Sequence, residues 1–469
     1  MRPSLDEMIG LDAEVRILDL LITEIVRQNP GKFRYKGKIR VGRKAYSPET
    51  MLKLYLYGYL NKIRSSRNLE AECNRNIEVM WLLGSLKPDF KTISDYRRDN
   101  GKQIKFLTRQ VRLFLRDKKY IKGEVVAIDG TKIKANAKRE MLTRTGLEKR
   151  LSKMTDDMED YLAELETNDI HDEQDHDDTS CHRQLVDKVI KLEQEIEKLQ
   201  GYKKDMDARG VNYYSPADPD AKLMKAREGK IPAYNVQSAV DSEHGMIASL
   251  KVCDSPVDQQ QLKAMVDQVE RDIGFAPEIV SADKGYHNPD MIEDVEQNEK
   301  TMCAIPAPVS SRDKEEIEFQ YDEEADEYLF SQGKRLVLLS RNKKKRNSIA
   351  NVYQGTECDG CSLRSVCTTS KMGRIIHRYH NQEWRDRYRD RLQARAVRAL
   401  INQRKTIVEH PFGTIRAWMG KTQLLLRGRP KVQIEMDLYG SVYNLRRLMN
   451  LVSVDVLSEM IHGYDWKMA

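Results

Sequence analysis

Two short apolar, β-prone runs that each end in aspartate constrain the fold of this chain more than any other feature. EVVAID ends at Asp129 and EIVSAD ends at Asp283. Runs of this length and composition are typical of buried strands, and a side chain at the end of such a strand reaches solvent. A third acid, Glu409, follows an Arg-rich stretch of helical character in INQRKTIVEHPFGTIR. One Asp at a strand end often only caps a turn, so the interpretation rests on the combination of the three.

The order of the segments predicts a mixed α/β fold. Residues 1 to about 120 read as helical, and the first strand follows at residues 124–129. The apolar runs IPAYNVQSAVD and GMIASLKVCD lie on either side of residues 242–245, a pattern typical of a β-hairpin. An amphipathic helix, the strand that ends at Asp283, a further helix and the run KTMCAIP come next. We therefore expect one sheet interrupted by two insertions, with Glu409 on a late helix.

The first insertion carries two apolar series at heptad-like spacing on either side of an acidic stretch. The first series is Leu147, Leu151, Met154 and Met158, and the second is Leu185, Val189, Leu192, Ile196 and Leu199. Two such series predict an antiparallel helical hairpin. We expect this hairpin to serve packing or assembly. Three histidines in or beside the acidic stretch are interpreted as solvated side chains and not as metal ligands: His171, His176 and His182.

The net charge of +7 hides a strong asymmetry along the chain. Residues 1–123 hold 27 Lys and Arg against 14 Asp and Glu, residues 146–200 hold 7 against 17, and residues 371–430 hold 15 against 4. Two basic blocks around an acidic one predict a polyanion partner on part of the surface. In the first block, six cations recur at helical spacing: Arg98, Lys102, Lys105, Arg109, Arg112 and Arg116. They predict one basic ridge, provided that Gly101 does not break the helix, and the alternative is a solvated helix face.

Composition excludes several classes of protein. Charged residues make up 33% of the chain and the mean hydropathy is −0.67. No apolar run approaches the roughly 18–20 residues of a membrane span. The segment MRPSLDEMIGLDAEVR has acids where a signal peptide has an apolar run. Seven cysteines in 469 residues argue against a disulfide framework. We therefore expect a cytoplasmic protein.

The residues around the three acids resemble those of bacterial insertion-sequence transposases of the DDE type. The similar words are AIDGTKIKANA at Asp129, YNVQSAVD on the next strand, ADKGY at Asp283 and VEHPFGTIR at Glu409, with SSRNLE and YNLRRL towards the two ends of the chain. The resemblance implies a ribonuclease-H-like catalytic core. In that fold the first Asp lies on the first strand, the second on or just after the fourth, and the Glu on a later helix.

The resemblance also implies an activity, a cofactor and a partner. The enzyme would bind the ends of its insertion sequence and catalyse DNA strand cleavage and strand transfer near the bacterial nucleoid. Asp129, Asp283 and Glu409 would hold two Mg or Mn ions, the arrangement of two-metal phosphodiester chemistry. The partner would be double-stranded DNA, bound by a homodimer or a larger homo-oligomer. Two other functions stay open: a ribonuclease-H-like nuclease or resolvase, and a domesticated DNA-binding regulator without catalysis.

Basic residues near the acids are candidates for phosphate contacts. Lys284 follows the second Asp directly. Many similar transposases have a Tyr and an Arg seven and four residues before the Glu, and a Lys seven residues after it. Here those positions hold Asn402, Lys405 and Arg416. Charge is kept at two of the three positions, but Arg and Lys differ at bidentate phosphate sites, and the Tyr has no counterpart.

The resemblance divides the chain into six segments. They are a helical, basic DNA-binding domain over 1–123, the first strand of the catalytic core over 124–140, an inserted helical hairpin or coiled coil over 141–205, the rest of the core over 206–310, an insertion with a cysteine cluster over 311–384, and the C-terminal catalytic helices over 385–469.

The second insertion holds three closely spaced cysteines: Cys358, Cys361 and Cys367. Three such thiols are a moderate signal for structural zinc, which normally has four ligands. Similar transposases often carry another Cys upstream, near residues 328–330, where this chain has none. His377 or His380 would then complete the site. The alternative is a reduced cluster without metal.

Overall fold

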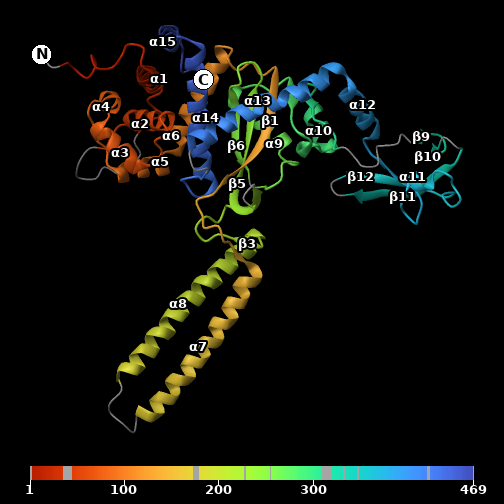
Figure 1. Ribbon diagram of the computed structural model, residues 1–469, viewed down its shortest axis with the longest axis horizontal. Helices are drawn as coiled ribbons and strands as arrows, with labels where there is room; N and C mark the ends of the chain where they lie inside the picture. The colour runs from red at the N-terminus through yellow and green to blue at the C-terminus, as the bar shows by residue number, and fades with distance from the viewer. Residues whose placement is uncertain are drawn as a thin grey trace.

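The computed structural model describes residues 3–34, 45–172, 179–226, 229–253, 255–308, 319–330, 333–345, 348–419 and 423–467. Figure 1 shows a sheet covered by helices, with a bundle of N-terminal helices on one side and a small all-β part on the other. A long helical hairpin projects away from the sheet (Figure 1). The chain therefore has the mixed α/β fold that the order of its segments predicts.

The central sheet has six strands: β1 (Val125–Lys134), β4 (Lys222–Ala226), β5 (Gly229–Asp241), β6 (Ile247–Cys253), β7 (Ile279–Ser281) and β8 (Met302–Ala304). β5 pairs antiparallel with β1, and also with β4 and β6. β1 pairs parallel with β7, and β7 pairs parallel with β8. The β5–β6 pair is the hairpin predicted from the sequence, and β8 lies in the run KTMCAIP.

Helices cover both faces of this sheet: α9 (Leu262–Ile273), α10 (Pro289–Glu296), α13 (Arg395–Met419) and α14 (Arg429–Leu451), with a 3-10 turn η1 (Lys284–Tyr286) between β7 and α10. On one face, Val408 of α13 packs with Ala127 and Val240. On the face to which Ile128 points, Asp272 of α9 accepts a hydrogen bond from Ser249 Oγ. Burial on both faces explains why the strands read as almost continuous apolar runs.

The N-terminal bundle contains α1 (Glu14–Gln28), α2 (Pro48–Leu60), α3 (Ser66–Arg75), α4 (Ile77–Leu82), α5 (Phe90–Asp99) and α6 (Gly101–Asp117), and α15 (Val454–His462) packs against α1. Ser47 caps α2 by accepting a hydrogen bond from the Thr50 N–H, as the word SPET predicts. α6 joins the bundle to the helices of the sheet, because it packs directly against α14. The approach is so close that a Cβ atom at Gly101 would overlap Ile434. No helix in the described ranges is long and apolar enough to cross a membrane.

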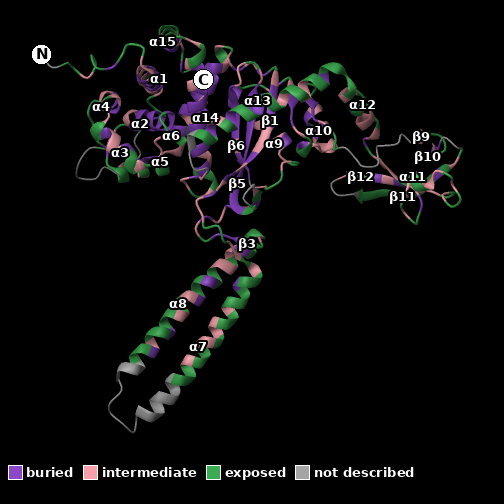
Figure 2. Ribbon diagram, viewed as in Figure 1, coloured by how far each residue is buried: buried purple, intermediate pink, exposed green. Residues whose placement is uncertain are grey.

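The hairpin consists of α7 (Arg144–Asp172) and α8 (Thr179–Arg209), with the short pair β2 (Leu142–Thr143) and β3 (Tyr213–Tyr214) at its base. Its buried side chains lie along the seam between the two helices, and most others are exposed (Figure 2). This is the antiparallel pair that the two apolar series predict. Of the acidic stretch, residues 168–178, the part from 173 to 178 lies outside the described residues, as do the side chains of the three histidines.

The second insertion forms a separate antiparallel sheet: β9 (Phe319–Asp322), β10 (Glu327–Phe330), β11 (Arg335–Lys345), β12 (Ser348–Gly355) and β13 (Ile375–Tyr379), with the short helix α11 (Arg364–Cys367) before β13. A helix, α12 (Gln382–Gln393), then leads back to α13 and the central sheet. Ser348, Asn381 and Arg385 bond to acids of α10, and these contacts tie the insertion to the core.

Candidate functional site

The pairing of β1 with β7 brings two of the predicted acids together. The strands run parallel, with Val125 aligned to Ile279 and Ala127 to Ser281. Asp129 and Asp283 each lie two residues further along, beside the C-terminal end of β7, so they stand at this edge and on the same face of the sheet. The prediction that the first strand ends at Asp129 is wrong, because β1 continues to Lys134 along β5. Carboxyl ends of parallel strands are where α/β folds commonly place their ligand sites.

The environment of Asp129 disfavours its charged form. Burial raises the pKa of this carboxyl to about 6, and the neighbouring carboxylates of Asp283 and Asp258 act in the same direction. The Arg404 guanidinium opposes them, with its Nη1 atom 3.7 Å from Asp129 Oδ1. Asp283 also caps the 3-10 turn η1, because its side chain accepts a hydrogen bond of 2.8 Å from the Gly285 N–H.

α13 crosses the same face, but the carboxylate of Glu409 does not join the two aspartates. Val408 is buried beneath the helix and Arg404 lies beside Asp129. The Glu409 side chain is turned to the flank of the helix, where it is 65% exposed and 3.9 Å from Lys405. Within the described part of the chain, no group of three or more His, Cys, Asp or Glu residues is close enough to hold a metal ion.

Another acid of the C-terminal helices, Glu435, is not available to this site. It is fully buried on α14 and accepts hydrogen bonds from the backbone N–H groups of Leu425 and Leu426. Arg64 of the N-terminal bundle lies 3.8 Å away. Glu435 therefore holds a loop and a contact with the N-terminal bundle.

The donor set at this edge fits a hard divalent cation only in part. Carboxylate oxygens are the ligands that Mg²⁺ prefers, and a cation between Asp129 and Asp283 would relieve their mutual repulsion. The two aspartates therefore satisfy the chemistry of a metal site. A third ligand from α13 requires the Glu409 side chain or its helix to move toward this pair.

Two charged residues at the edge were missed by the sequence interpretation. Arg404 is one helical turn before the buried Val408, and this spacing could have identified it as facing the sheet. Among the residues that the structure describes, its buried Nη1 atom has no hydrogen-bond partner. Asp258 follows the end of β6 by five residues, so nothing in the local pattern marks it as part of the site.

The basic ridge predicted on residues 98–116 is wrong as a continuous surface. α5 ends at Asp99 and α6 begins at Gly101, so the helix does break, and Arg98 belongs to a different helix from the other five cations. Arg98 is exposed and forms ion pairs with Asp95 and Asp99 on its own helix.

Two further members of that row face the protein interior. Arg112 is only 4% exposed and lies 3.6 Å from Asp272 and 3.9 Å from Asp437. Arg116 donates a hydrogen bond to the carbonyl of Ile273 at the end of α9. The acceptors belong to α9 and α14, which the spacing of residues on α6 cannot reveal.

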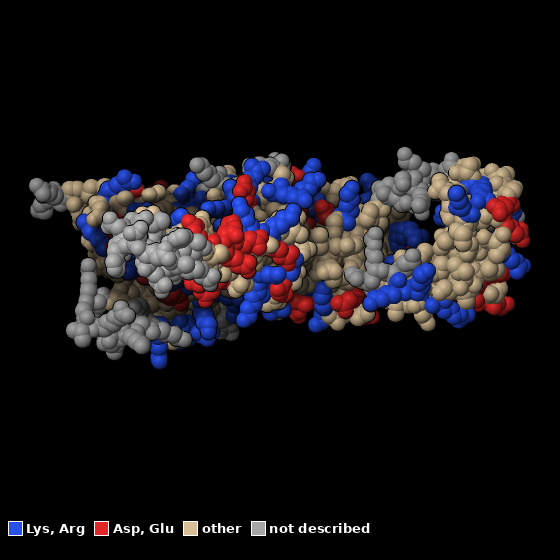
Figure 3. Space-filling view, turned by 90° about the horizontal axis from the view of Figure 1, so that it is seen from below, with Lys and Arg blue, Asp and Glu red and all other residues tan. Residues whose placement is uncertain are grey.

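The other predicted contact residues are accessible to different extents. Lys102, Lys105, Lys284 and Lys405 are exposed, Arg109 is half-buried, and Arg416 donates to Thr131 Oγ1 from an exposed position on α13. In the view of Figure 3, acidic side chains gather near the middle of the face and Lys and Arg lie on both sides of them. The accessible cations are therefore spread over α6, η1 and α13 and do not form one row on α6.

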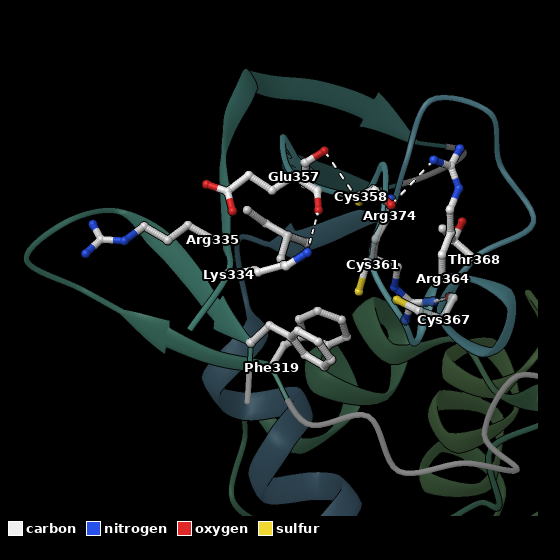
Figure 4. A pocket seen from close by; sticks show the side chains of 13 residues that line it. Phe319, Lys334, Arg335, Glu357, Cys358, Cys361, Arg364, Cys367, Thr368 and Arg374 are labelled. Atoms are coloured by element: carbon white, nitrogen blue, oxygen red, sulfur yellow. Dashed lines mark hydrogen bonds between the residues drawn. The ribbon is translucent and has the colours of Figure 1, made fainter. Parts of the chain in front are cut away.

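The three cysteines of the second insertion line one small pocket of about 30 Å³ (Figure 4). Burial raises the pKa of Cys367, the nearby thiols raise it further, and Arg374 lowers it. Cys358 Sγ accepts a hydrogen bond from the Arg374 N–H. Neither His377 nor His380 lines this pocket, so neither supplies a fourth zinc ligand in this arrangement. The zinc site stays a prediction.

Comparisons with known proteins give two family matches. Residues 3–99 match a family described as a transposase domain (DUF772), and residues 331–449 match a family described as a transposase DDE domain. Glu409 lies within the second match, whereas Asp129 and Asp283 lie outside both. No curated protein matches the chain.

Among solved structures, the chain is similar to a piggyBac transposase in a synaptic complex with hairpin DNA. The identity is 9% and the TM-score is 0.34, over 97% of this chain and 79% of the other. A likeness of this degree carries no argument about the site.

Proposed function

We propose that this chain, a DNA transposase of the DDE type, binds the ends of its mobile element, cuts there and joins those ends to target DNA, with Asp129, Asp283 and Glu409 as its catalytic carboxylates. The two family matches carry the assignment as a transposase. The parallel register of β1 and β7, with α13 across the same face, is the observation that carries the choice of residues.

The central sheet supports a ribonuclease-H-like core. Asp129 lies on the first strand, and Asp283 follows β7, which is the fourth strand when the short β4 is counted with the β5 hairpin. Glu409 comes from a helix that follows both insertions. The three acids therefore follow the order of elements that the resemblance of the sequence motifs implies.

In the proposed mechanism, Asp129 and Asp283 would hold two Mg²⁺ or Mn²⁺ ions, and Glu409 would complete the ligand set if α13 or its side chain moved toward them. When bound, the ions activate the attacking water or 3′ hydroxyl and stabilise the leaving oxygen of an in-line displacement. Arg404 partly neutralises Asp129, with its Nη1 atom 3.7 Å from Asp129 Oδ1.

Exposed cations on either side of the acids orient the DNA. Lys284 follows Asp283, and Lys405 and Arg416 lie on α13 around Glu409. Lys102 and Lys105 add positive charge on α6. Contacts of this kind go to phosphates and make binding depend on salt rather than on base sequence.

A joining assay tests the proposal. The substrate is duplex DNA that carries the matched inverted repeats flanking the gene, mixed with plasmid target and Mg²⁺. We expect nicks at the repeat ends and covalent products in which a 3′ end is joined to the plasmid. Cut DNA without joined products would favour the nuclease or resolvase, and binding without any cut would favour the regulator.

A further inference from the structure

Directly behind Asp129, the sheet is packed by a polar cluster that leaves no room for a side chain on the next residue. A Cβ atom at Gly130 would lie 2.7 Å from Asp258 Oδ1 and 3.1 Å from the Tyr286 hydroxyl, and it would overlap the Gln237 amide. Gly130 and Asp129 point to opposite faces of β1. The cluster therefore packs directly against the backbone of β1 next to Asp129, the first proposed catalytic residue.

Asp258 is the acceptor at the centre of this cluster. Its Oδ1 atom accepts hydrogen bonds from Asn235 Nδ2 at 2.8 Å and from Gln237 Nε2 at 2.7 Å, and Lys132 Nζ lies 3.3 Å away. Asn235 and Gln237 are on β5, paired with Lys132 and Gly130 of β1. One carboxylate oxygen thus ties the two strands together beside Asp129.

The same cluster reaches the second catalytic Asp through Tyr286. The buried Tyr286 hydroxyl donates to Gln237 Oε1, and the Tyr286 N–H donates to the Asp283 carbonyl at 3.0 Å. Gln237 therefore donates to Asp258 with one end of its amide and accepts from the η1 turn with the other. The chain of hydrogen bonds runs from Asp258 through Gln237 and Tyr286 to the turn that begins at Asp283.

We infer that Asp258 is a positioning residue that fixes Asp129 and Asp283 relative to each other, through Gly130 on one side and through Gln237 and Tyr286 on the other. The inference rests on the proposed function and names a fourth acid for the same site. Asp258 acts through neighbours rather than as a ligand, because its three polar partners converge on Oδ1 from the face opposite to Asp129.

Residues that orient metal ligands from behind contribute about 10–100-fold to metal affinity or activity. Asp258→Ala removes the acceptor and frees Gln237 and Asn235. Asp258→Asn keeps a carbonyl oxygen acceptor at the Oδ1 position, removes the charge and replaces Oδ2 with an NH₂ group. A positioning role therefore predicts a large loss for Ala and a small one for Asn, whereas a metal ligand would lose its function with either change.

The experiment measures Mn²⁺ affinity by electron paramagnetic resonance and single-turnover cleavage of terminal-repeat DNA. The matched control is Asp267→Asn, an acid on α9 that pairs only with Lys263 among its described contacts. We expect Asp258→Ala to lose about 10–100-fold in both quantities, with DNA affinity unchanged. Asp258→Asn and the control should stay within a few-fold of the parent.

The inference would be overturned if Asp258→Ala kept the Mn²⁺ affinity and cleavage rate of the parent. It would also be overturned if Asp258→Asn were as inactive as Asp129→Asn. If Asp258→Ala does not fold, Tyr286→Phe and Gly130→Ala test the same cluster, and parental Mn²⁺ affinity in both would overturn it. Failure of the proposed function is a different result, in which the parent protein itself neither cuts nor joins the DNA.

Discussion

The arginine–aspartate cluster at the edge of the sheet and the one at the junction of α6, α9 and α14 differ in access to solvent. At the edge of the sheet, Arg404 approaches Asp129, whose side chain is 28% exposed and has Asp283 beside it. At the junction of α6, α9 and α14, Arg112 lies between Asp272 and Asp437, and all three are almost fully buried. We call the first the open cluster and the second, by the low exposure of its side chains, the closed cluster; its three residues line the wall of a pocket of about 330 Å³.

The pKa of one acid is raised to about the same value in both clusters. Burial is the main cause for Asp129 and for Asp437, and each pKa is raised to about 6 despite the neighbouring arginine. At the junction, Ser249, Gln268 and Gln433 add hydrogen bonds to the acids. A raised pKa alone does not mark a functional site. Solvent access separates the edge, which can bind a cation, from the junction, which holds helices together.

The largest effect expected is the loss of DNA cleavage on neutralising the acids of the open cluster. Asp129→Asn and Asp283→Asn preserve size and remove charge, so each should lower the cleavage rate by about 10³-fold or more, and the double variant should add little because the two act as a unit. Single-turnover cleavage of terminal-repeat DNA measures this. Additive losses would mean that the two acids act independently.

The closed cluster should govern stability instead. Arg112→Ala leaves two buried aspartates without their cation, and breaking a buried pair costs about 3–5 kcal/mol. Urea unfolding of the variant measures this, with Lys102→Ala on the exposed side of α6 as the control. Equal unfolding free energies for the two variants would contradict a structural role for Arg112.

Exposed lysines of α6 should affect DNA binding without affecting the fold. Replacing Lys102 and Lys105 with Gln should flatten the dependence of log affinity on log salt by up to about 0.9 for each phosphate that the lysines no longer neutralise. Fluorescence anisotropy at several salt concentrations measures the slope. Lys198→Gln with Lys203→Gln, on the acidic hairpin, is the matched control and should leave it unchanged. An unchanged slope for both pairs would move DNA binding away from α6.

The smallest effect expected is a dependence of stability on pH. The pKa of Asp129 is about 6 in the folded chain and 3.8 as its ordinary value, so folding favours the protonated acid and this contribution is lost as pH rises from about 4 to 6. Metal-free Asp129→Asn should therefore be more stable than the parent at pH 7.5, by on the order of 1 kcal/mol, and lose that advantage near pH 4. Thermal melts across this range measure it, and a constant difference would contradict the buried charge.

Sequence patterns predicted the structural features that depend on residues close together in the chain. The two apolar strands that carry or precede Asp129 and Asp283 and the paired helices α7 and α8 follow from local periodicity and are present in the structure. The predicted end of the first strand at Asp129 is wrong, because pairing with β5 extends β1 to Lys134. The burial of Arg112 could not be predicted, because its partners, Asp272 and Asp437, come from helices far along the chain. The orientation of Glu409 depends on how α13 is rotated against the sheet, which the helical spacing leaves undetermined.

The measurement that tests the central claim most directly is cleavage of terminal-repeat DNA by Glu409→Gln. Glu459→Gln, an exposed acid on α15, is the control, and circular dichroism confirms that both variants are folded. If Glu409 moves to complete the site of Asp129 and Asp283, Glu409→Gln should cut as poorly as Asp129→Asn while binding DNA as the parent does. Parental cleavage by Glu409→Gln would contradict the account and leave the two aspartates without their third partner.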